Sequence, residues 1–129
     1  MSWVIDASSV VDLLSTGPRS ARTWAIVGDD VLHAPDLLVA EVTSALARIA
    51  RAGTPGVDAA VLELAAMPLT THATLPLVTA VWNRRDGLRI ADAFYVELAR
   101  ALSLPLVTSD ARLGRAIEQQ SLCDVRVVD

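Results

Sequence analysis

Short apolar segments alternate along the chain with longer segments in which apolar residues recur every three or four positions. The short segments are rich in β-branched residues and predict strands, whereas the periodic segments predict helices. The predicted strands span residues 2–6, 31–35, 68–74, 104–110 and 124–129. The predicted helices span residues 8–16, 19–27, 36–53, 57–67, 75–85, 89–104 and 111–120. This alternation predicts one α/β domain over residues 1–129, a three-layer α/β/α sandwich with a central, mainly parallel sheet.

The helix predicted over residues 36–53 carries a glutamate, Glu41, in the middle of its apolar stripe. Asp36 is placed to cap the start of this helix, and Gly53 is placed to end it. A glutamate on a core-facing stripe is rare unless it is paired. Arg48 is one candidate partner, although it lies two turns away on the same helix. A metal-binding or catalytic role for Glu41 is the interpretation that we favour.

Three aspartates, Asp6, Asp92 and Asp110, also lie in segments of apolar or small residues. Each has a structural explanation when it is taken alone. Asp6 and Asp110 follow predicted strands and can cap the next helix. Asp92 lies in the first turn of a helix, where the helix dipole favours a carboxylate, but a solvated aspartate would not need the apolar neighbours that surround it.

Taken together, the four acids predict a metal site. Ligand sites in parallel sheets form beyond the carboxyl ends of the strands, where Asp6 and Asp110 lie, and the two helix acids can converge on the same edge. Two carboxylates about 4 Å apart repel each other by roughly 4 kcal/mol at an effective dielectric constant of about 20, so four together call for a cation. Ligands that are all oxygen suit Mg²⁺ or Mn²⁺ better than zinc.

The composition is that of a folded domain, because apolar residues make up 53% of the 129 residues. The formal net charge is −4, which gives no support to nucleic-acid binding but does not exclude it, since the acidic cluster itself contributes. All eleven basic residues are arginine, so mechanisms that need a lysine are excluded. Cys123 is the only cysteine, and neither a signal peptide nor a membrane-length apolar run is seen, so we expect a cytoplasmic protein. His33 and His72 are expected to lie apart from the acids and from each other.

Four segments, VIDASS, LLVAEVTSALAR, RIADAFYVELARAL and LVTSDARL, are similar in order and spacing to the four motifs of the PIN domain. The resemblance is strongest to the VapC-type toxins of bacterial toxin–antitoxin pairs, and it covers essentially the whole chain. It implies a Mg²⁺-dependent endoribonuclease in which a metal-activated water hydrolyses RNA phosphodiester bonds, and Mn²⁺ is expected to substitute. The family's acidic quartet, as catalytic residues and metal ligands, maps onto Asp6, Glu41, Asp92 and Asp110.

The resemblance also implies further site residues and partners. Ser8 and Thr108 match the family's hydroxyl positions and are expected to hold the carboxylates by hydrogen bonds. Arg89, Arg112 and Arg115 flank the motifs and are candidates for contacts with RNA phosphates, although a solvated helix surface is the interpretation that we favour for them. The implied partners are a small antitoxin that covers the acidic pocket and a second copy of the chain in a homodimer.

Two other functions remain open at this point. Another metal-dependent phosphoryl-transfer domain, such as a receiver or a phosphatase, would also place aspartate at a strand end. The familiar forms of those domains use a lysine, which this chain lacks. Alternatively, the domain is a PIN-like binding module without catalysis, whose acids hold an arginine-bearing peptide.

Overall fold

The five strands form one sheet in which every neighbouring pair is parallel, as predicted. The computed structural model describes residues 1–129. The strands lie in the order β3-β2-β1-β4-β5. Their bounds are β1 Ser2–Ile5, β2 Val31–Pro35, β3 Leu69–His72, β4 Leu106–Thr108 and β5 Val125–Val127. Each observed strand therefore lies within a predicted one. The predictions over residues 104–110 and 124–129 are longer than the observed β4 and β5.

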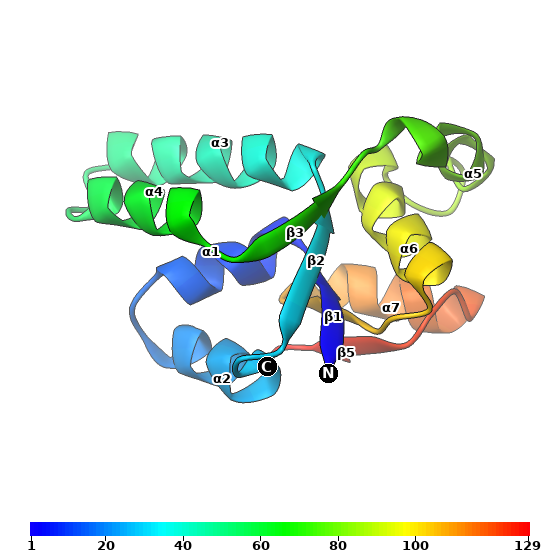
Figure 1. Ribbon diagram of the computed structural model, residues 1–129, viewed down its shortest axis with the longest axis horizontal. Helices are drawn as coiled ribbons and strands as arrows, with labels where there is room; N and C mark the ends of the chain where they lie inside the picture. The colour runs from blue at the N-terminus through cyan, green and yellow to red at the C-terminus, as the bar shows by residue number, and fades with distance from the viewer.

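Helices cover both sides of this sheet, which confirms the three-layer α/β/α sandwich. Figure 1 shows α1–α4 on one side of the sheet and α5–α7 on the other. The helices are α1 Ala7–Leu14, α2 Pro18–Val27, α3 Leu37–Arg51, α4 Val57–Ala66, α5 Val78–Asn83, α6 Ile90–Leu102 and α7 Ala111–Gln120, and a short 3₁₀ turn, Leu75–Leu77, precedes α5. None of these helices is long and apolar enough to cross a membrane.

One expected helix cap is absent. Asp36 stands at the N-cap position of α3, but its side chain accepts no capping hydrogen bond. A capping side chain needs an extended backbone at its own position, whereas Asp36 has a helical one, with φ −64° and ψ −18°. The prediction that Asp36 caps this helix is therefore wrong.

The order of the strands puts a switch point between β1 and β4. From β1 the chain moves to β2 and β3 on one side, and it then returns to add β4 and β5 on the other side of β1. In doubly wound sheets, a crevice forms at this point beyond the carboxyl ends of the strands, because the two connections leave in opposite directions. Asp6 follows β1 directly, and Asp110 comes two residues after the end of β4.

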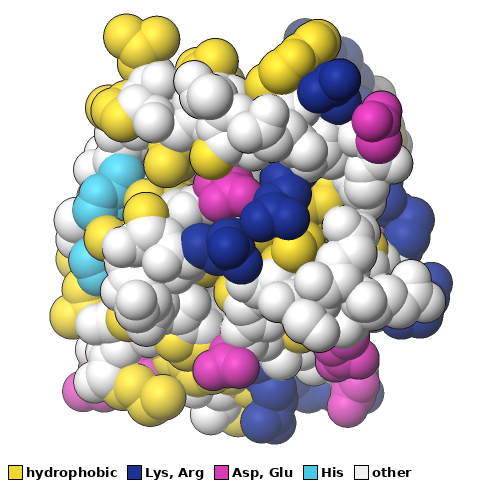
Figure 2. Space-filling view, turned by 90° about the vertical axis from the view of Figure 1, so that its right-hand side faces the viewer, with side chains coloured by type: hydrophobic (Ala, Val, Ile, Leu, Met, Phe, Trp, Pro, Cys, Tyr) yellow, Lys and Arg dark blue, Asp and Glu magenta, His cyan; other side chains and the backbone are white.

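The core fills the space between the sheet and its helices with 26 buried apolar residues. Helix α7 packs closely against β5 through Gly114, where an added Cβ atom would lie 2.3 Å from a methyl group of Val127. This close approach fixes the start of α7 against the sheet and thereby fixes the position of Asp110. On the face that carries α5, α6 and α7, arginine side chains gather around an acidic side chain near the centre (Figure 2).

Candidate metal site at the carboxyl edge of the sheet

Asp6 is a buried carboxylate that caps helix α1. Its backbone is extended, and its Oδ1 atom accepts a hydrogen bond from the amide of Ser9 at 3.1 Å. The hydroxyl of Ser8 donates to the same oxygen at 2.7 Å, and the hydroxyl of Thr108 donates to Oδ2. Asp6 is only 5% exposed and has no cation within ion-pair distance. Asp6 can therefore be both a helix cap and a metal ligand. The capping hydrogen bond satisfies part of one carboxylate oxygen, but no positive charge balances the carboxylate.

Thr108 connects the two aspartates that follow neighbouring strands. Its hydroxyl donates to Asp6 and accepts a hydrogen bond from the amide of Asp110 at 3.0 Å. Asp110 in turn caps α7 by accepting hydrogen bonds from the amides of Arg112 at 2.9 Å and Leu113 at 3.2 Å. A single threonine side chain therefore separates Asp6 from the backbone of Asp110 across the switch point.

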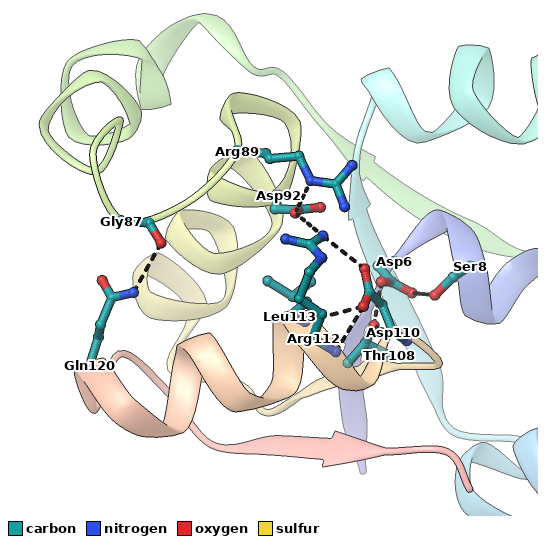
Figure 3. Close-up of polar contacts among 10 residues, drawn as sticks. All are labelled: Asp6, Ser8, Gly87, Arg89, Asp92, Thr108, Asp110, Arg112, Leu113 and Gln120. Atoms are coloured by element: carbon teal, nitrogen blue, oxygen red, sulfur yellow. Dashed lines mark hydrogen bonds and ion pairs between the residues drawn. The ribbon is translucent and has the colours of Figure 1, made fainter.

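Helix α6 brings Asp92 to the same edge, where arginines surround it (Figure 3). The Nη2 atom of Arg112 lies 3.3 Å from Asp92 Oδ2 and 3.1 Å from Asp110 Oδ2, so that one guanidinium bridges two of the four acids. The Nε atom of Arg89 lies 3.7 Å from the same oxygen of Asp92. Both arginines are largely exposed, and such ion pairs contribute little to stability.

Glu41 reaches the edge from α3 and is held there by Tyr95. The phenol of Tyr95 donates a short hydrogen bond to Glu41 Oε1. Tyr95 lies one turn after Asp92 on α6 and is 2% exposed, so its ring packs in the core while its hydroxyl faces the acids. The alternative partner, Arg48, makes no ion pair with Glu41.

The charges at this edge influence one another. Burial raises the pKa of Asp6 to about 6, although hydrogen bonds from Thr108, Ser8 and Ser9 act in the opposite direction and the charge of Asp92 adds to the rise. Burial, the hydrogen bond to Glu41 and the charges of Glu41, Asp6 and Asp92 all raise the pKa of Tyr95 well above its usual value. Three of the four acids therefore lie close enough to the phenol of Tyr95 to act on it, and Tyr95 remains a neutral donor.

Asp110 behaves differently from Asp6. Burial acts to raise its pKa, but the amide of Leu113, the charge of Arg112 and the amide of Arg112 together outweigh burial, and the pKa lies below its usual value. Asp110 is thus ionised and compensated, whereas Asp6 is buried without compensation. Of these two aspartates, Asp6 is therefore the one whose ionised form a bound cation would stabilise more.

The oxygen atoms at this edge fit a hard divalent cation. A carboxylate offers about four acceptor positions, and Asp6 uses three of them, two on Oδ1 and one on Oδ2. Glu41 accepts one side-chain hydrogen bond, so most of its acceptor positions are free. The atoms that could bind a metal are carboxylate and hydroxyl oxygens only. Oxygen ligands of this kind are the ones that Mg²⁺ and Mn²⁺ prefer.

The four acids share one edge of the sheet, but they do not form a closed metal-binding group. No three of the Asp, Glu, His and Cys side chains are arranged so that they could hold an ion directly. Asp92 and Asp110 instead face the guanidinium of Arg112. A divalent ion bound by those two acids would therefore compete with Arg112 for the same oxygens.

Asp12 on α1 is a further polar residue beside the site, and the sequence pattern does not point to it. The hydroxyl of Ser109 donates to Asp12 on α1 and lies 3.1 Å from the hydroxyl of Ser9, and its amide donates to Ser8 at 3.1 Å. These bonds tie the loop after β4 to α1 and so hold the surroundings of Asp6. Asp12 lies at an ordinary polar position of an amphipathic helix, so no sequence signal distinguishes it.

Glu97 is a fifth acid inside an apolar segment, and its role is structural. Its side chain is 9% exposed and pairs with Arg84 at 2.9 Å and with Arg100 at 3.4 Å. Arg100 follows Glu97 by three residues on α6, a spacing that brings side chains together and could have indicated this pair. Glu97 shows how this chain compensates a buried carboxylate with arginine, which it does not do for Asp6.

The two histidines are close together, contrary to the expectation that they lie apart. His33 Nδ1 and His72 Nε2 are 2.9 Å apart. His33 pairs in register with Thr70, and His72 comes two residues later on the same face of β3, so the two rings are diagonal neighbours. Burial and the charge of His72 lower the pKa of His33. Both belong to the strands rather than to the acidic edge.

Of the three arginines proposed to contact RNA, two reach the site. Arg89 and Arg112 contact Asp92, whereas Arg115 is exposed and forms no ion pair. Arg112 is exposed, as the solvated-surface interpretation expects, and its guanidinium also bridges two acids; contact of these arginines with RNA stays a prediction.

Comparison with known proteins places this geometry in a family. The family model of the PIN domain matches residues 3–118. A relative from Mycobacterium tuberculosis, Ribonuclease VapC3, is 47% identical over 117 residues, which cover 88% of this chain and 85% of the relative. Ribonuclease VapC1 and Ribonuclease VapC9 of the same organism are 36% and 31% identical, with 88% and 97% of this chain covered and 89% and 97% of the relatives.

Two solved structures share the fold. PAE2754 from Pyrobaculum aerophilum has a TM-score of 0.67 and 24% sequence identity, covering 90% of this chain and 87% of the other. VapBC2 from Rickettsia felis, solved with a DNA fragment from its promoter, has a TM-score of 0.67 and 13% identity, covering all of both chains. At these identities the likeness concerns the fold alone.

Proposed function

The chain belongs to the PIN domain family, and on this premise we propose that it is an endoribonuclease of the VapC type, the toxin of a toxin–antitoxin pair. The observation that carries the proposal is the buried, uncompensated Asp6 at the switch point of the sheet, with three further carboxylates beside it. The relatives that share most of the chain's length are named ribonucleases. The RNA substrate implies a location in the cytoplasm.

The proposed cofactor is Mg²⁺, for which Mn²⁺ is expected to substitute. Asp6 and Asp92 are proposed as direct ligands, and Glu41 and Asp110 as ligands directly or through water. A divalent cation at such a site supplies activation of water and stabilisation of the negative charge that develops on the phosphate during hydrolysis. The four acids would hold the ion at this edge of the sheet, and their negative charge and oxygen atoms would favour such an ion.

Three neutral residues are proposed to orient the carboxylates. Ser8 donates to Oδ1 of Asp6 and Thr108 donates to Oδ2. These two hydrogen bonds fix the plane of the carboxylate and favour its ionised form. Tyr95 fixes one oxygen of Glu41 and leaves the other free to point into the site. Such partners behind a ligand limit its movement and thereby favour one binding geometry.

Two arginines are proposed to receive the substrate. When Asp92 and Asp110 bind a cation instead of Arg112, the guanidinium of Arg112 becomes available to a phosphate of the RNA. Arg89 lies on the other side of Asp92 and can contact a neighbouring phosphate. Such contacts position the RNA without reading its sequence. Arg115, three residues beyond Arg112, is proposed as a more distant contact of the same kind.

A small antitoxin protein is the proposed partner, and a homodimer is the proposed assembly. VapC-type names among the relatives and the VapBC2 structure support the first of these. A groove of about 440 Å³ lies between α1 and α3 and includes Ser8, Glu41 and Arg48 among its lining residues. This groove opens beside the acids, so a partner bound there would block access to them.

Metal-dependent cleavage of RNA tests the proposal. Wild type, Asp6→Asn and Asp92→Asn would be purified and incubated with structured and single-stranded RNA in Mg²⁺, in Mn²⁺ and in EDTA. We expect cleavage by the wild type in either metal, none in EDTA, and a loss of at least about 100-fold in both variants. Asp58→Asn, which changes an exposed acid in the first turn of α4, is the matched control and should cleave like the wild type. Equal cleavage by all four proteins would contradict the assignment of the site.

A further inference from the structure

A shallow groove beside the acidic edge combines an aromatic ring with several arginines. It has a volume of about 580 Å³ and lies where α5, α6 and α7 meet. Among the residues that line it are Trp82, Arg85, Asp86, Arg89, Ile90 and Arg112. Figure 2 shows the face on which α5–α7 lie, where arginine and apolar side chains adjoin an acidic side chain. We call this feature the Trp82 groove.

The Trp82 groove is continuous with the candidate metal site. Arg112 lines the groove and contacts Asp92 and Asp110. Arg89 also lines it and contacts Asp92 (Figure 3). A chain that passes through the groove therefore arrives directly at the acids.

An exposed π-stack forms the outer part of the groove. The guanidinium carbon of Arg85 lies 4.6 Å from the centre of the Trp82 ring, and Arg85 Nη1 donates to the carbonyl of Trp82 at 3.0 Å. Trp82 nevertheless remains 60% exposed. An indole with one face on a guanidinium and much of its surface in water is a platform on which a nucleobase can stack, because every base has a π-face.

The charge of the groove favours a polyanion. Three guanidiniums, those of Arg85, Arg89 and Arg112, line it with one carboxylate, that of Asp86, while Asp92 and Asp110 beside the groove pair with Arg89 and Arg112. A cation bound by Asp92 and Asp110 would compensate these two acids and leave the guanidiniums of the groove available to phosphates. A second copy of the chain, which is acidic overall, matches this charge less well than a nucleic acid does.

The segment that carries Arg85 and Arg89 is held in place. Gln120 on α7 donates to the carbonyl of Gly87 at 3.0 Å (Figure 3), and the amides of Gly87 and Leu88 both donate to the carbonyl of Arg84. The side chain of Arg84 is bound to the buried Glu97. The arginines of the groove therefore project from an anchored turn, which lowers the entropy lost when they bind a ligand.

We propose that the Trp82 groove binds the single-stranded RNA that flanks the scissile phosphate. One base stacks on the Trp82–Arg85 pair, while Arg89 and Arg112 contact the phosphates that lead from this base to the acids. The groove gives affinity and direction but little base preference, because stacking and phosphate contacts tolerate every sequence. This inference rests on the proposed ribonuclease function.

Binding without cleavage tests the groove separately from catalysis. All variants are made in the Asp6→Asn background, and binding of a fluorescein-labelled single-stranded RNA of about 12 nucleotides is followed by anisotropy, with Mg²⁺ present. We expect Trp82→Ala to weaken binding at least about fivefold, since the variant loses the aromatic ring on which the base stacks. Trp82→Phe should retain most of the affinity because it keeps an aromatic face.

Matched controls lie on the opposite side of the molecule. Trp24 on α2 is 47% exposed, and Trp24→Ala should bind RNA like its parent. Arg89→Ala should reduce the slope of log affinity against log salt by roughly 0.7, as expected for the loss of one phosphate contact, whereas Arg19→Ala on α2 should not. Far-ultraviolet circular dichroism confirms that each variant is folded.

Intrinsic fluorescence reports directly on the ring. RNA should quench the fluorescence of Trp24→Phe, which retains Trp82, and it should leave that of Trp82→Phe nearly unchanged. Equal quenching of the two variants, or equal RNA affinity of Trp82→Ala and Trp24→Ala, overturns the inference. Loss of a dimer in Trp82→Ala by analytical ultracentrifugation, with RNA affinity unchanged, also overturns it and assigns the surface to self-association. If the wild type cleaves RNA while any of these results is found, only the groove is wrong. If the wild type does not cleave RNA, the proposed function itself has failed.

Discussion

The hydroxyl of Tyr95 donates a hydrogen bond to Glu41, and this bond joins two helices that lie on opposite sides of the sheet. Tyr95 comes from α6 and Glu41 from α3, so the bond passes over the carboxyl ends of the strands. It gives the acid that approaches from the far side of the sheet a fixed position relative to Asp92, one turn before Tyr95.

Removing this hydroxyl should weaken metal binding while the fold is retained. Tyr95→Phe keeps the buried ring but leaves Glu41 without its donor, so we expect the Kd for Mn²⁺ to rise several-fold and RNA cleavage to fall about 10-fold. Isothermal titration calorimetry and cleavage assays measure the two effects. The lost hydrogen bond to a charged group should cost about 1–2 kcal/mol of stability.

A double-mutant cycle separates this role from simple packing. If Tyr95 acts through Glu41, then Glu41→Gln and the double variant Tyr95→Phe/Glu41→Gln should have the same residual activity. Additive losses would show that Tyr95 contributes in some other way.

The buried charge of Asp6 should make the metal-free protein less stable as the pH rises. Its pKa in the folded protein, about 6, lies above the ordinary aspartate value of 3.8. The folded state thus binds the proton more tightly, and stability from this group falls between about pH 4 and pH 6 and is constant above that range. The total loss is on the order of 2–3 kcal/mol at 1.4 kcal/mol for each pKa unit.

Asp6→Asn removes this dependence and serves as the comparison. We expect the variant to gain stability relative to the wild type as the pH is raised from 4 to 7, measured by urea unfolding in EDTA, because all other carboxylates cancel in the difference. Millimolar Mg²⁺ or Mn²⁺ should raise the melting temperature of the wild type but not of the variant. A stability difference that is the same at pH 4 and pH 7 would contradict the buried-charge argument.

Neutralising Arg112 should have opposite effects on metal and on substrate. Arg112→Gln leaves Asp92 and Asp110 without their shared cation, so the local potential becomes more negative and the Kd for Mn²⁺ should fall a few-fold. Cleavage should nevertheless decrease, because a phosphate contact is lost, and the decrease should be larger in KM than in kcat. Arg115→Gln, on the same helix but without an ion pair to these acids, should leave metal affinity unchanged. Weaker metal binding in Arg112→Gln would exclude competition between the guanidinium and the ion.

Glu97 provides a contrast with Asp6, because both are buried acids. Glu97→Gln removes the partner of Arg84 and Arg100, so we expect a loss of roughly 1–3 kcal/mol in the free energy of unfolding, since both arginines are only partly buried. Thermal or urea unfolding measures this loss, and the affinity for Mn²⁺ should not change. A stabilising Glu97→Gln would refute the structural role of Glu97.

The sequence was sufficient to predict where the acids of this site lie along the chain. It was not sufficient to predict which side chains pair with them. The positions of Asp6 and Asp110 at strand ends follow from hydrophobic patterns that are read over a few residues. The bridge from Arg112 to Asp92 joins positions 20 residues apart, and it depends on the angle at which α6 and α7 meet. No pattern along the chain encodes that angle.

The same limit explains the histidines. His33 and His72 are neighbours only because β2 pairs with β3 in one particular register. A shift by a single residue would place the two rings on opposite faces of the sheet. Each strand could be predicted from its own residues, but the register between them is decided by the packing of the whole domain.

The central position of β1 has a consequence for biosynthesis. β1 is made first, yet it pairs with β4, and the hydroxyl that orients Asp6 belongs to Thr108. A nascent chain therefore cannot assemble its acidic centre until most of the polypeptide has left the ribosome. The arrangement of the carboxylates is therefore completed late in synthesis, because it needs segments from both halves of the chain.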